Sequence, residues 1–530
     1  MEETHVTQAQ QQSDLQKQLW AVANDLRGNM DASEYRNYIL GLIFYRFLSD
    51  KVESYASDLL KNDDMTFTEA YADSDIQEGL KDEVIKTLGF FIEPQYLYST
   101  LVENIHAGNF DIETLQIAVN EVQNSTIGFE SESDFRGLFT DMNLSSNRLG
   151  NTVAKRSELI AKVMLNLADI PFNQSDAKID VLGDAYEYLI GQFAASAGKK
   201  AGEFYTPQQV SKILAGIVTM GKDKIQSAYD PTMGSGSLLL RVGDHAQIGE
   251  YYGQELNDTT YNLARMNLLM HGVSYNRFDV YNGDTLEDDR AGDKQFDVVV
   301  ANPPYSAKWN TEGKLDDERF RKYGKTAPKS KADFAFVEHM LFHLKQDGTM
   351  AVVLPHGVLF RGAGEGQIRR YMIEKDNVLD AVIGLPANLF FGTSIPTTIL
   401  VFKKNRTRKD IFFIDASSDF EKGKNQNRLT DANVEKILKT YQDRQDIEKY
   451  SHVAEMSEIE ENEFNLNIPR YVDTFEEEPP VDVDKLVKDM TETDAEIKQL
   501  ESEFSSMLQD LTSQDADAQQ QLNQIKELFK

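Results

Sequence analysis

Apolar residues recur at helical spacing through the first 170 residues of the chain. Between Leu19 and Lys51 they stand three or four positions apart, and a polar break at Gly28–Asp31 divides the run into two expected helices. The same spacing continues to about Ile170 with few strand-like runs. We therefore expect residues 1–170 to form a helical domain whose amphipathic faces are mainly core, with an interface role as the alternative.

After residue 203 the pattern changes, and short strand-like runs alternate with helical stretches. Seven or eight such runs predict an α/β fold, a mostly parallel, doubly wound sheet over residues 171–422. The last two runs are close in sequence, so we expect them to form an antiparallel hairpin at the sheet edge. The runs are Ile225–Tyr229, Ile248–Gln254, Phe278–Tyr281, Phe296–Ala301, Thr349–Leu354, Val378–Gly384, Thr397–Phe402 and Ile411–Ile414.

Polarity rises near the end of the chain. Residues 423–480 are interpreted as a polar and acidic connecting region. Apolar residues then recur by threes and fours for about four heptads, which predicts a coiled-coil-like helical arm for subunit contacts over residues 481–530. A helix folded back onto its own domain is the alternative. The seam consists of Leu486, Met490, Ile497, Leu500, Phe504, Met507 and Leu511.

Composition adds limits to this picture. The chain has 530 residues, enough for two or three domains, and a formal net charge of -32. A chain this acidic is repelled by nucleic acid unless basic groups are gathered locally or a partner supplies them. No run reaches the roughly 18 apolar residues of a membrane helix, and the start is too polar for a signal peptide. We expect a cytoplasmic protein without a membrane partner.

Metal and thiol chemistry have little support. The sequence has no Cys, which excludes disulfides and thiolate metal sites. His339 and His343 stand four positions apart, but Met340 occupies the position where a zinc-protease helix carries its Glu. We interpret both histidines as core or solvated residues and expect no metal.

The strand ending at Ala301 is followed by Asn302-Pro303-Pro304-Tyr305. The side-chain carbonyl of Asn302 and the next peptide carbonyl, held stiff by the prolines, can accept both hydrogens of a planar exocyclic amine. Tyr305 offers a face on which a heterocycle can stack. The tetrapeptide therefore predicts a nucleobase-amine site at the carboxyl edge of the sheet, and a plain Pro-Pro turn is the alternative.

A second set of residues precedes the tetrapeptide. Asp230 ends the first strand, and Gly234-Ser235-Gly236-Ser237 opens a helix, which lets a ligand come close to the backbone. Leu239 stands where the dinucleotide fingerprint requires a third glycine, which disfavours hydride transfer. Glu255 ends the second strand and could accept from ribose hydroxyls, and Asp284 follows the third and could accept from an adenine amine. Each could be a surface acid, but three at successive strand ends indicate a site.

Taken in order, these motifs resemble the S-adenosylmethionine-dependent amino-methyltransferases of DNA. Residues Glu203-Phe204-Tyr205-Thr206-Pro207-Gln208 look like the additional cofactor motif of that family, and the order of motifs is that of its adenine-modifying gamma arrangement. The chain resembles most closely the modification subunit of type I restriction-modification systems. That resemblance is carried by residues 19–51, 182–190, 390–396 and 467–471.

The resemblance implies methyl transfer from S-adenosyl-L-methionine to the exocyclic N6 of adenine in DNA, with the target base flipped out of the duplex. It implies a catalytic role for Asn302, Pro303, Pro304 and Tyr305, and stacking of the target base between Tyr305 and Phe391 or its neighbour Phe390. The implied cofactor contacts are Glu203, Phe204, Tyr205, Thr206, Pro207, Gln208, Asp230, Gly234, Ser235, Gly236, Ser237, Glu255 and Asp284.

The resemblance also implies partners. In that family a separate specificity subunit recognises the DNA sequence, and a second modification subunit and restriction subunits complete the complex. A locally basic stretch could contact the DNA backbone through Lys308, Arg319, Arg321, Lys322 and Lys325, with a solvated loop as the alternative. Two other functions stay open: methylation of another planar nitrogen, such as a protein glutamine amide or a ribosomal RNA base, and a cofactor-binding scaffold without turnover.

Overall fold

The computed structural model describes most of the chain, which divides into two compact units, residues 1–473 and 474–530. The described residues are 17–21, 32–63, 65–170, 181–196, 206–390, 393–423, 426–474 and 482–529. Five predicted features therefore lie outside the described residues: the break at Gly28–Asp31, the cofactor residues Glu203, Phe204 and Tyr205, and the stacking residue Phe391.

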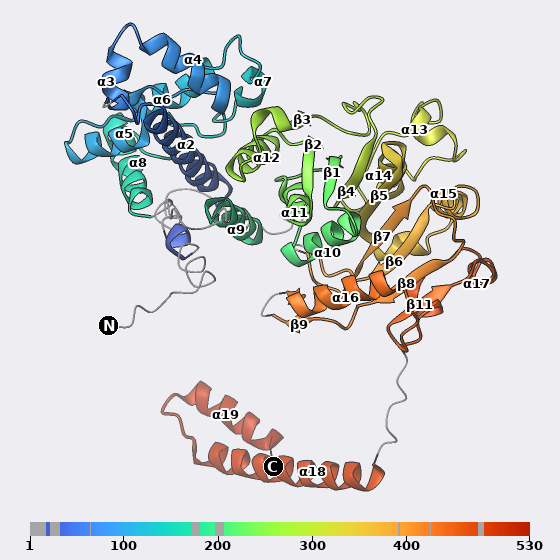
Figure 1. Cartoon of the computed structure of the whole chain (residues 1–530). Helices are drawn as coiled ribbons and strands as arrows, with labels where there is room; N and C mark the ends of the chain where they lie inside the picture. The colour runs from blue at the N-terminus through green and yellow to red at the C-terminus, as the bar shows by residue number, and fades with distance from the viewer. Residues whose placement is uncertain are drawn as a thin grey trace, which may run out of the picture. The chain divides into compact units, whose positions relative to one another are not determined.

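Helices make up the first part of the larger unit, as predicted (Figure 1). The long α2 carries Tyr38, Leu42, Tyr45 and Leu48 at helical spacing, and all four are buried in the core, so the amphipathic face is core. The described helices are α2 (Ala32–Leu59), α3 (Phe67–Ala72), α4 (Gln77–Leu88), α5 (Tyr98–His106), α6 (Ile112–Asn124), α7 (Glu132–Phe135) and α8 (Val153–Ala168), with a 3-10 turn at Pro94–Tyr96.

A nine-stranded mixed sheet follows, in the order β11-β8-β6-β7-β5-β4-β1-β2-β3. All eight predicted strands are present, and β11 is the ninth. The strands are β1 (Lys224–Asp230), β2 (Gln247–Glu255), β3 (Phe278–Asn282), β4 (Phe296–Ala301), β5 (Leu344–Pro355), β6 (Leu379–Gly384), β7 (Thr397–Lys403), β8 (Ile411–Asp415) and β11 (Ser451–Ala454). A separate two-stranded ribbon pairs β9 (Glu421–Lys422) with β10 (Asn427–Arg428).

Both faces of the sheet are covered, which explains the continuous apolar runs of its strands. In β4, Val298 and Val300 belong to one hydrophobic cluster, whereas Val299 and Ala301 belong to the other. The first cluster contains α10 (Gln208–Thr219), α11 (Ser237–His245), α12 (Asp258–Met270) and α16 (Asp431–Asp443), and also reaches α9 (Val181–Ser196). The second contains α13 (Glu318–Arg321), α14 (Asp333–Phe342), α15 (Ala363–Glu374) and α17 (Met456–Glu461).

The predicted edge hairpin between the last two strands is wrong. β7 pairs antiparallel with both β5 and β6, and β8 pairs parallel with β6 on the far side. β7 is therefore an interior strand of the sheet, and its residues are buried except for the last. The turn that follows β7 crosses over β6, where Arg406 Nε donates to Asp380 Oδ1 at 3.1 Å.

The interpretation of residues 423–480 as a connecting region is also wrong for most of its length. β11 pairs antiparallel with β8 and extends the sheet, and α16 packs on the same face of the sheet as α10. Ile459 and Leu466 are fully buried. The described polar residues of this region belong to surface positions of folded elements, and the first unit continues to Asp473. Residues 475–480 of the predicted connector lie outside the described residues.

The second unit contains α18 (Val483–Asp510) and α19 (Ala516–Leu528), which form a helical hairpin. The rings of Phe504 and Phe529 meet edge to face at 5.1 Å, and Lys526 Nζ donates to two carbonyls at the end of α18. The predicted helical arm is confirmed, although α19 was not foreseen as a separate helix. Across both units, none of the helices in the described ranges combines the length and the apolar character that crossing a membrane requires.

Candidate active site

Four predicted site segments meet at one edge of the sheet. β4, β1, β2 and β3 are parallel neighbours, so their carboxyl ends lie side by side. Asn302 follows β4, Asp230 ends β1, Glu255 ends β2, and Asp284 stands two residues after β3. The topology therefore brings together the amine site and the three acids that the sequence places at separate strand ends.

The glycine loop after β1 is held in the shape that its sequence requires. Gly234 and Gly236 have φ angles of 56° and 78°, in the left-handed region that favours glycine. The Gly234 N–H donates to Glu255 Oε2 at 3.0 Å, and Asn267 of α12 donates to the Ser235 carbonyl at 2.9 Å. The loop is thus fixed by groups from β2 and α12.

Burial raises the pKa values of two acids at this edge, Asp230 and Glu255. Asp230 is almost completely buried, and burial raises its pKa to about 8, although its Oδ1 accepts from the Thr232 N–H at 2.8 Å. Burial also raises the pKa of Glu255, against the N–H groups of Asn257 and Gly234. Two carboxyls that are costly to ionise suit a ligand that brings positive charge or hydroxyl donors.

The amide of Asn302 is oriented by two neighbours. Its Nδ2 donates to Thr206 Oγ1 at 3.2 Å, and its Oδ1 accepts from the Tyr305 hydroxyl at 2.9 Å. Thr206 stands at the start of α10 and is buried, so the second half of the predicted cofactor motif touches the tetrapeptide. The side-chain carbonyl of Asn302 consequently points toward the aromatic residue of the motif.

Tyr305 also contacts Phe390, one of the two residues considered for the opposite face of the target base. Its ring lies 5.8 Å from that of Phe390, with an interplanar angle of 74°. Burial and the nearby Asp333 carboxylate hold the pKa of Tyr305 well above its ordinary value. Its hydroxyl therefore remains a hydrogen-bond donor at neutral pH.

Asp333, which the sequence patterns do not single out, supports the turn after the tetrapeptide. Ser306 has a φ angle of 52°, unusual for a side-chain-bearing residue, and its N–H donates to Asp333 Oδ1 at 2.8 Å. Arg361 pairs with the other oxygen of Asp333 at 2.7 Å and with Glu365 at 2.7 Å. Asp333 is fully buried. An acid at the head of an apolar helix was the only sequence signal for it.

The predicted DNA-backbone contacts divide into two groups. Arg319 is 6% exposed and hydrogen-bonded throughout, so its assignment to DNA is wrong. Lys308 and Lys325 are exposed, and Arg321 has 63% of its side chain exposed. Lys322 is half exposed and pairs with Asp376 at 2.7 Å.

His339 of α14 and His343, which follows the helix, are fully buried. They are therefore core residues, the first of the two interpretations made from the sequence. Together with Asp289 they place one potential metal ligand each within 4.8 Å. The guanidinium of Arg319 lies 3.1 Å from His339 Nδ1 and 3.7 Å from Asp289 Oδ2, so a positive charge already adjoins the cluster. His343 donates to Asp289 at 2.9 Å, and although burial opposes it, this bond together with the nearby positive charge lowers the pKa of Asp289 to about 2. The cluster is a buried polar network.

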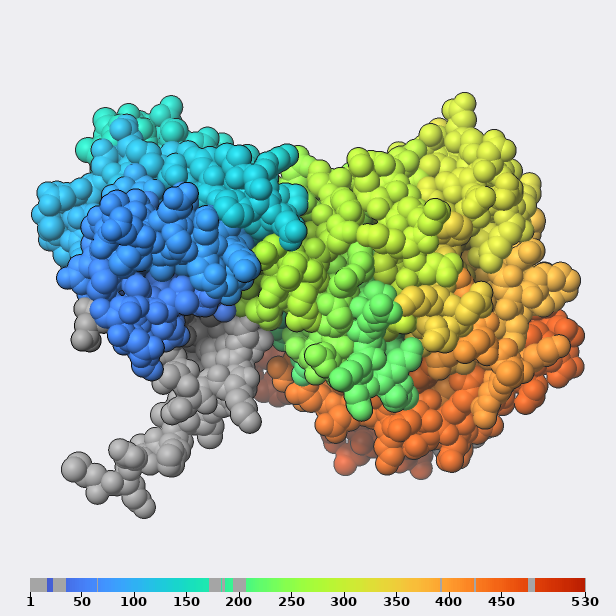
Figure 2. Space-filling view, turned by 45° about the horizontal axis from the view of Figure 1, so that its top comes forward, coloured from blue at the N-terminus to red at the C-terminus, as the bar shows by residue number. Residues whose placement is uncertain are grey.

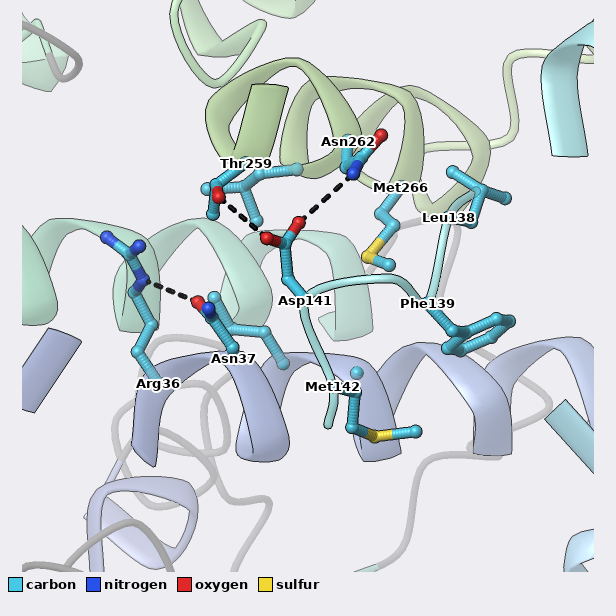
Figure 3. Close-up of a pocket in the computed structure, with 12 residues that line it drawn as sticks. Arg36, Asn37, Leu138, Phe139, Asp141, Met142, Thr259, Asn262 and Met266 are labelled. Carbon is cyan, nitrogen blue, oxygen red and sulfur yellow. Dashed lines mark hydrogen bonds between the residues drawn. The ribbon is translucent and has the colours of Figure 1, made fainter. Parts of the chain in front are cut away.

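Helix α12 also joins the sheet to the helical domain. Arg265 is buried and donates to three backbone carbonyls between residues 133 and 136 at 2.9–3.1 Å. Figure 3 shows Asp141 directed at Thr259 and Asn262, from which it accepts at 2.7 and 3.0 Å, beside a cavity of about 30 Å³. In Figure 2 the cyan helical region lies directly against the yellow-green region that contains α12. Because α12 also holds the glycine loop, the helical domain is linked to the glycine-loop side of the edge.

A parallel α/β edge with a glycine loop after β1, acids after β2 and β3, and Asn-Pro-Pro-Tyr after β4 defines the class of amino-methyltransferases. Comparison with known proteins agrees. Residues 177–479 match the family described as N-6 DNA Methylase, and residues 15–167 match the HsdM N-terminal domain. The chain belongs to this family, among the methylase subunits of type I restriction enzymes.

Individual relatives cover nearly the whole chain. The type I restriction enzyme MpnII methylase subunit of Mycoplasma pneumoniae is 38% identical over 527 residues, 95% of this chain and 97% of the relative. The MjaIX methylase subunit of Methanocaldococcus jannaschii is 27% identical over 92% of this chain and 88% of its own length. The crystal structure of a type I restriction-modification system methyltransferase subunit from Streptococcus thermophilus is 46% identical, with a TM-score of 0.81, covering 87% of this chain and 100% of that chain.

Proposed function

We propose that the chain transfers the methyl group of S-adenosylmethionine to the exocyclic N6 of adenine in a specific DNA site, as the modification subunit of a type I restriction-modification complex. The observation that carries the proposal is the orientation of Asn302. Thr206 holds its amide nitrogen at 3.2 Å, which leaves its carbonyl oxygen toward the aromatic side of the edge. That oxygen is the acceptor that an aromatic amine needs.

Asn302 and the Pro303 carbonyl would act on the nucleophile. The lone pair of an adenine amine is delocalised into the ring, so the amine is a weak nucleophile until its nitrogen becomes pyramidal. Two acceptors placed for its hydrogens stabilise the pyramidal nitrogen, and fixed acceptors do so without reorganisation during the reaction. Tyr305 would stack on the flipped base, with Phe391 as the proposed opposite face, because Phe390 is buried and packs edge to face on Tyr305 itself.

The edge also fits the cofactor. When bound, S-adenosylmethionine supplies a methyl group on a positively charged sulfur. Asp230, whose pKa is raised by burial, would be favoured in its ionised form by a nearby positive charge. Glu255 would accept from ribose hydroxyls, Asp284 from the adenine amine, and the Gly234–Ser237 loop would lie against the ligand, with residues 203–208 at its methionine end.

Lys308, Arg321, Lys322 and Lys325 remain proposed contacts for the DNA backbone. All four lie in the segment that directly follows the tetrapeptide and are exposed. These four positive charges form a small basic region in a chain whose net charge is -32. Because the rest of the chain repels DNA, a partner must supply most of the DNA affinity. We assign that part, and recognition of the sequence, to a specificity subunit, with a second modification subunit and restriction subunits in the full complex.

The seam of α18 is the proposed surface for subunit contacts. Its seven apolar residues are 47–69% exposed, and Leu508 is the only buried residue of the helix. α19 contacts the stripe at Phe504 through Phe529, and an apolar stripe that stays this exposed within its own unit is typical of a helix that pairs with a partner. The partner proposed for it is another subunit of the complex.

Transfer of a tritiated methyl group tests the proposal. The purified chain, with and without its specificity subunit, is incubated with labelled S-adenosylmethionine and DNA that lacks the modification. We expect label in DNA, as N6-methyladenine, only when the specificity subunit is present. Label in protein or RNA would instead select a different planar nitrogen as the acceptor, and cofactor binding without any transfer would indicate a scaffold.

A further inference from the structure

The turn after β3, which carries Asp284, is tied to the rest of the site from several sides. Thr285 Oγ1 donates to the Pro231 carbonyl at 2.5 Å, next to the acid that ends β1. Gln254, buried near the end of β2, donates to the Asp288 carbonyl at 2.7 Å. Asp284 itself is exposed, and its Oδ1 accepts from the Leu286 N–H at 3.0 Å. The direction of this carboxylate therefore depends on how the turn is held.

Two basic side chains from the segment after the tetrapeptide hold the turn from the opposite side. Arg319 donates from Nη1 to the Thr285 carbonyl at 2.9 Å and from Nη2 to the Leu286 carbonyl at 3.1 Å. Lys314 Nζ donates to the same Leu286 carbonyl at 2.5 Å. Arg319 and Lys314 are 6% and 8% exposed. Both cationic groups therefore bind backbone carbonyls inside the protein, beside Asp284.

The guanidinium of Arg319 is fixed in its plane. Asp317 accepts from Nε at 3.1 Å and from Nη2 at 2.7 Å. Behind it, Nη1 lies 3.1 Å from His339 Nδ1, and His339 Nε2 lies 2.9 Å from the hydroxyl of Tyr229, the residue before Asp230. All of its N–H groups thus have acceptors. A planar fork suits two successive carbonyls, which a lysine ammonium cannot match.

We propose that Arg319 is a positioning residue for cofactor recognition: it fixes the turn so that the Asp284 carboxylate faces the 6-amino group of the cofactor's adenine. This inference rests on the proposed function, because it takes the role of Asp284 from there. The buried Arg319 and Lys314 thus bind the backbone of the turn, whereas the exposed basic residues of the same segment face solvent.

The test compares two ligands on the full chain by isothermal titration calorimetry. One is S-adenosylhomocysteine, and the other is its analogue in which hydrogen replaces the 6-amino group. Wild type is expected to prefer the first by about fivefold, the effect of one hydrogen bond. Arg319→Lys keeps the charge but removes the fork, and its preference should fall to about twofold or less. Arg370→Lys, an exposed position of α15 outside the site, should keep the wild-type preference.

A double-mutant cycle with Asp284→Ala separates positioning from a general structural effect. If Arg319 acts through Asp284, Arg319→Lys has no further effect on the preference in the Asp284→Ala chain. Equal weakening of both ligands, or an unchanged preference, in Arg319→Lys would overturn the inference. If Arg319→Lys does not fold in thermal-unfolding measurements, Lys314→Met gives the same readout through the shared Leu286 carbonyl.

The cycle also distinguishes failure of the inference from failure of the proposed function. If wild type binds neither ligand, or if Asp284→Ala leaves the preference unchanged, the proposed cofactor site is wrong and the inference falls with it. If Asp284→Ala abolishes the preference while Arg319→Lys and Lys314→Met both keep it, only the role of Arg319 is refuted.

Discussion

Replacing Tyr305 with Phe tests how the amine site opens. The Tyr305 hydroxyl donates to Asn302 Oδ1 at 2.9 Å, and this oxygen is the proposed acceptor for the target amine. The hydroxyl occupies one of the two lone pairs of this oxygen and therefore competes with the target amine for the acceptor. Tyr305→Phe keeps the stacking ring and its contact with Phe390, but it removes the competing donor.

The size of the effect follows from the bond that is lost. A neutral hydrogen bond contributes about 0.5–1.5 kcal/mol net, so removing the competitor should tighten binding of target DNA by about two- to tenfold. Because burial holds the pKa of Tyr305 well above its ordinary value, the donor stays protonated. The gain should consequently be the same at pH 7 and pH 9.

The assay is binding of a DNA fragment that the assembled complex methylates, at fixed salt and with S-adenosylhomocysteine present, since salt alone changes DNA affinity strongly. Tyr371→Phe, which removes a hydroxyl from α15, is the control and should bind as wild type does. Unchanged or weaker binding by Tyr305→Phe would refute the reasoning. So would a loss of turnover above tenfold at unchanged affinity, because the hydroxyl would then take part in the reaction.

Three further outcomes are expected. Deleting residues 481–530, or introducing Leu500→Glu and Met507→Glu, should abolish co-purification with the specificity subunit. Glu503→Gln is the control and should co-purify as wild type does. If the deleted chain still assembles with the specificity subunit, the seam does not make this contact. Asp333→Asn can still accept from the Ser306 N–H but loses the ion pair to Arg361, so methyl transfer should fall by about tenfold. A parallel loss of cofactor affinity would contradict the idea that Asp333 acts only on the tetrapeptide. Both oxygens of Glu338 are buried without a partner among the described residues, and burial raises its pKa well above the usual value. The folded chain then keeps a proton that the unfolded chain loses, so the contribution of this one group to stability falls by about 1.4 kcal/mol per pH unit above its unfolded-state pKa of about 4.3. Asp230 contributes a slope of the same sign, so Glu338→Gln should reduce the slope in thermal unfolding between pH 5.5 and 7.5 by about 1.4 kcal/mol per pH unit, without abolishing it. A profile parallel to that of wild type would argue against it.

Much of the fold follows from local patterns in the sequence. Each strand of the sheet that was predicted is present because apolar runs buried on both faces are visible in one dimension, as β4 illustrates. The pairing of β7 was not visible in this way. Nearness in sequence suggested a hairpin with β8, but the network of Asp380 and Arg406 that carries the chain across β6 depends on the folded structure.

The candidate site shows the same division. Asn302, Asp230, Glu255 and Asp284 could be placed from the sequence because each stands at a strand end, and parallel neighbours bring strand ends together. Charge alone misassigned Arg319, because burial cannot be read from a basic run.

Groups that act at a distance along the chain were missed. Asp333 holds Ser306 from 27 positions away, and the contact between Thr206 and Asn302 spans 96 positions. No local spacing signals such pairs, since they form only when the helix or loop that carries one partner packs beside the other.

The central claim is that Asn302 accepts from the reacting amine, and one paired measurement on Asn302→Ala tests it most directly. Methyl transfer to DNA by the assembled complex and cofactor binding by the same preparation are measured against wild type. We predict that transfer falls by about 100-fold or more while cofactor affinity stays within about twofold, because the acceptor serves the transition state and not the cofactor. Transfer at the wild-type rate would contradict the account.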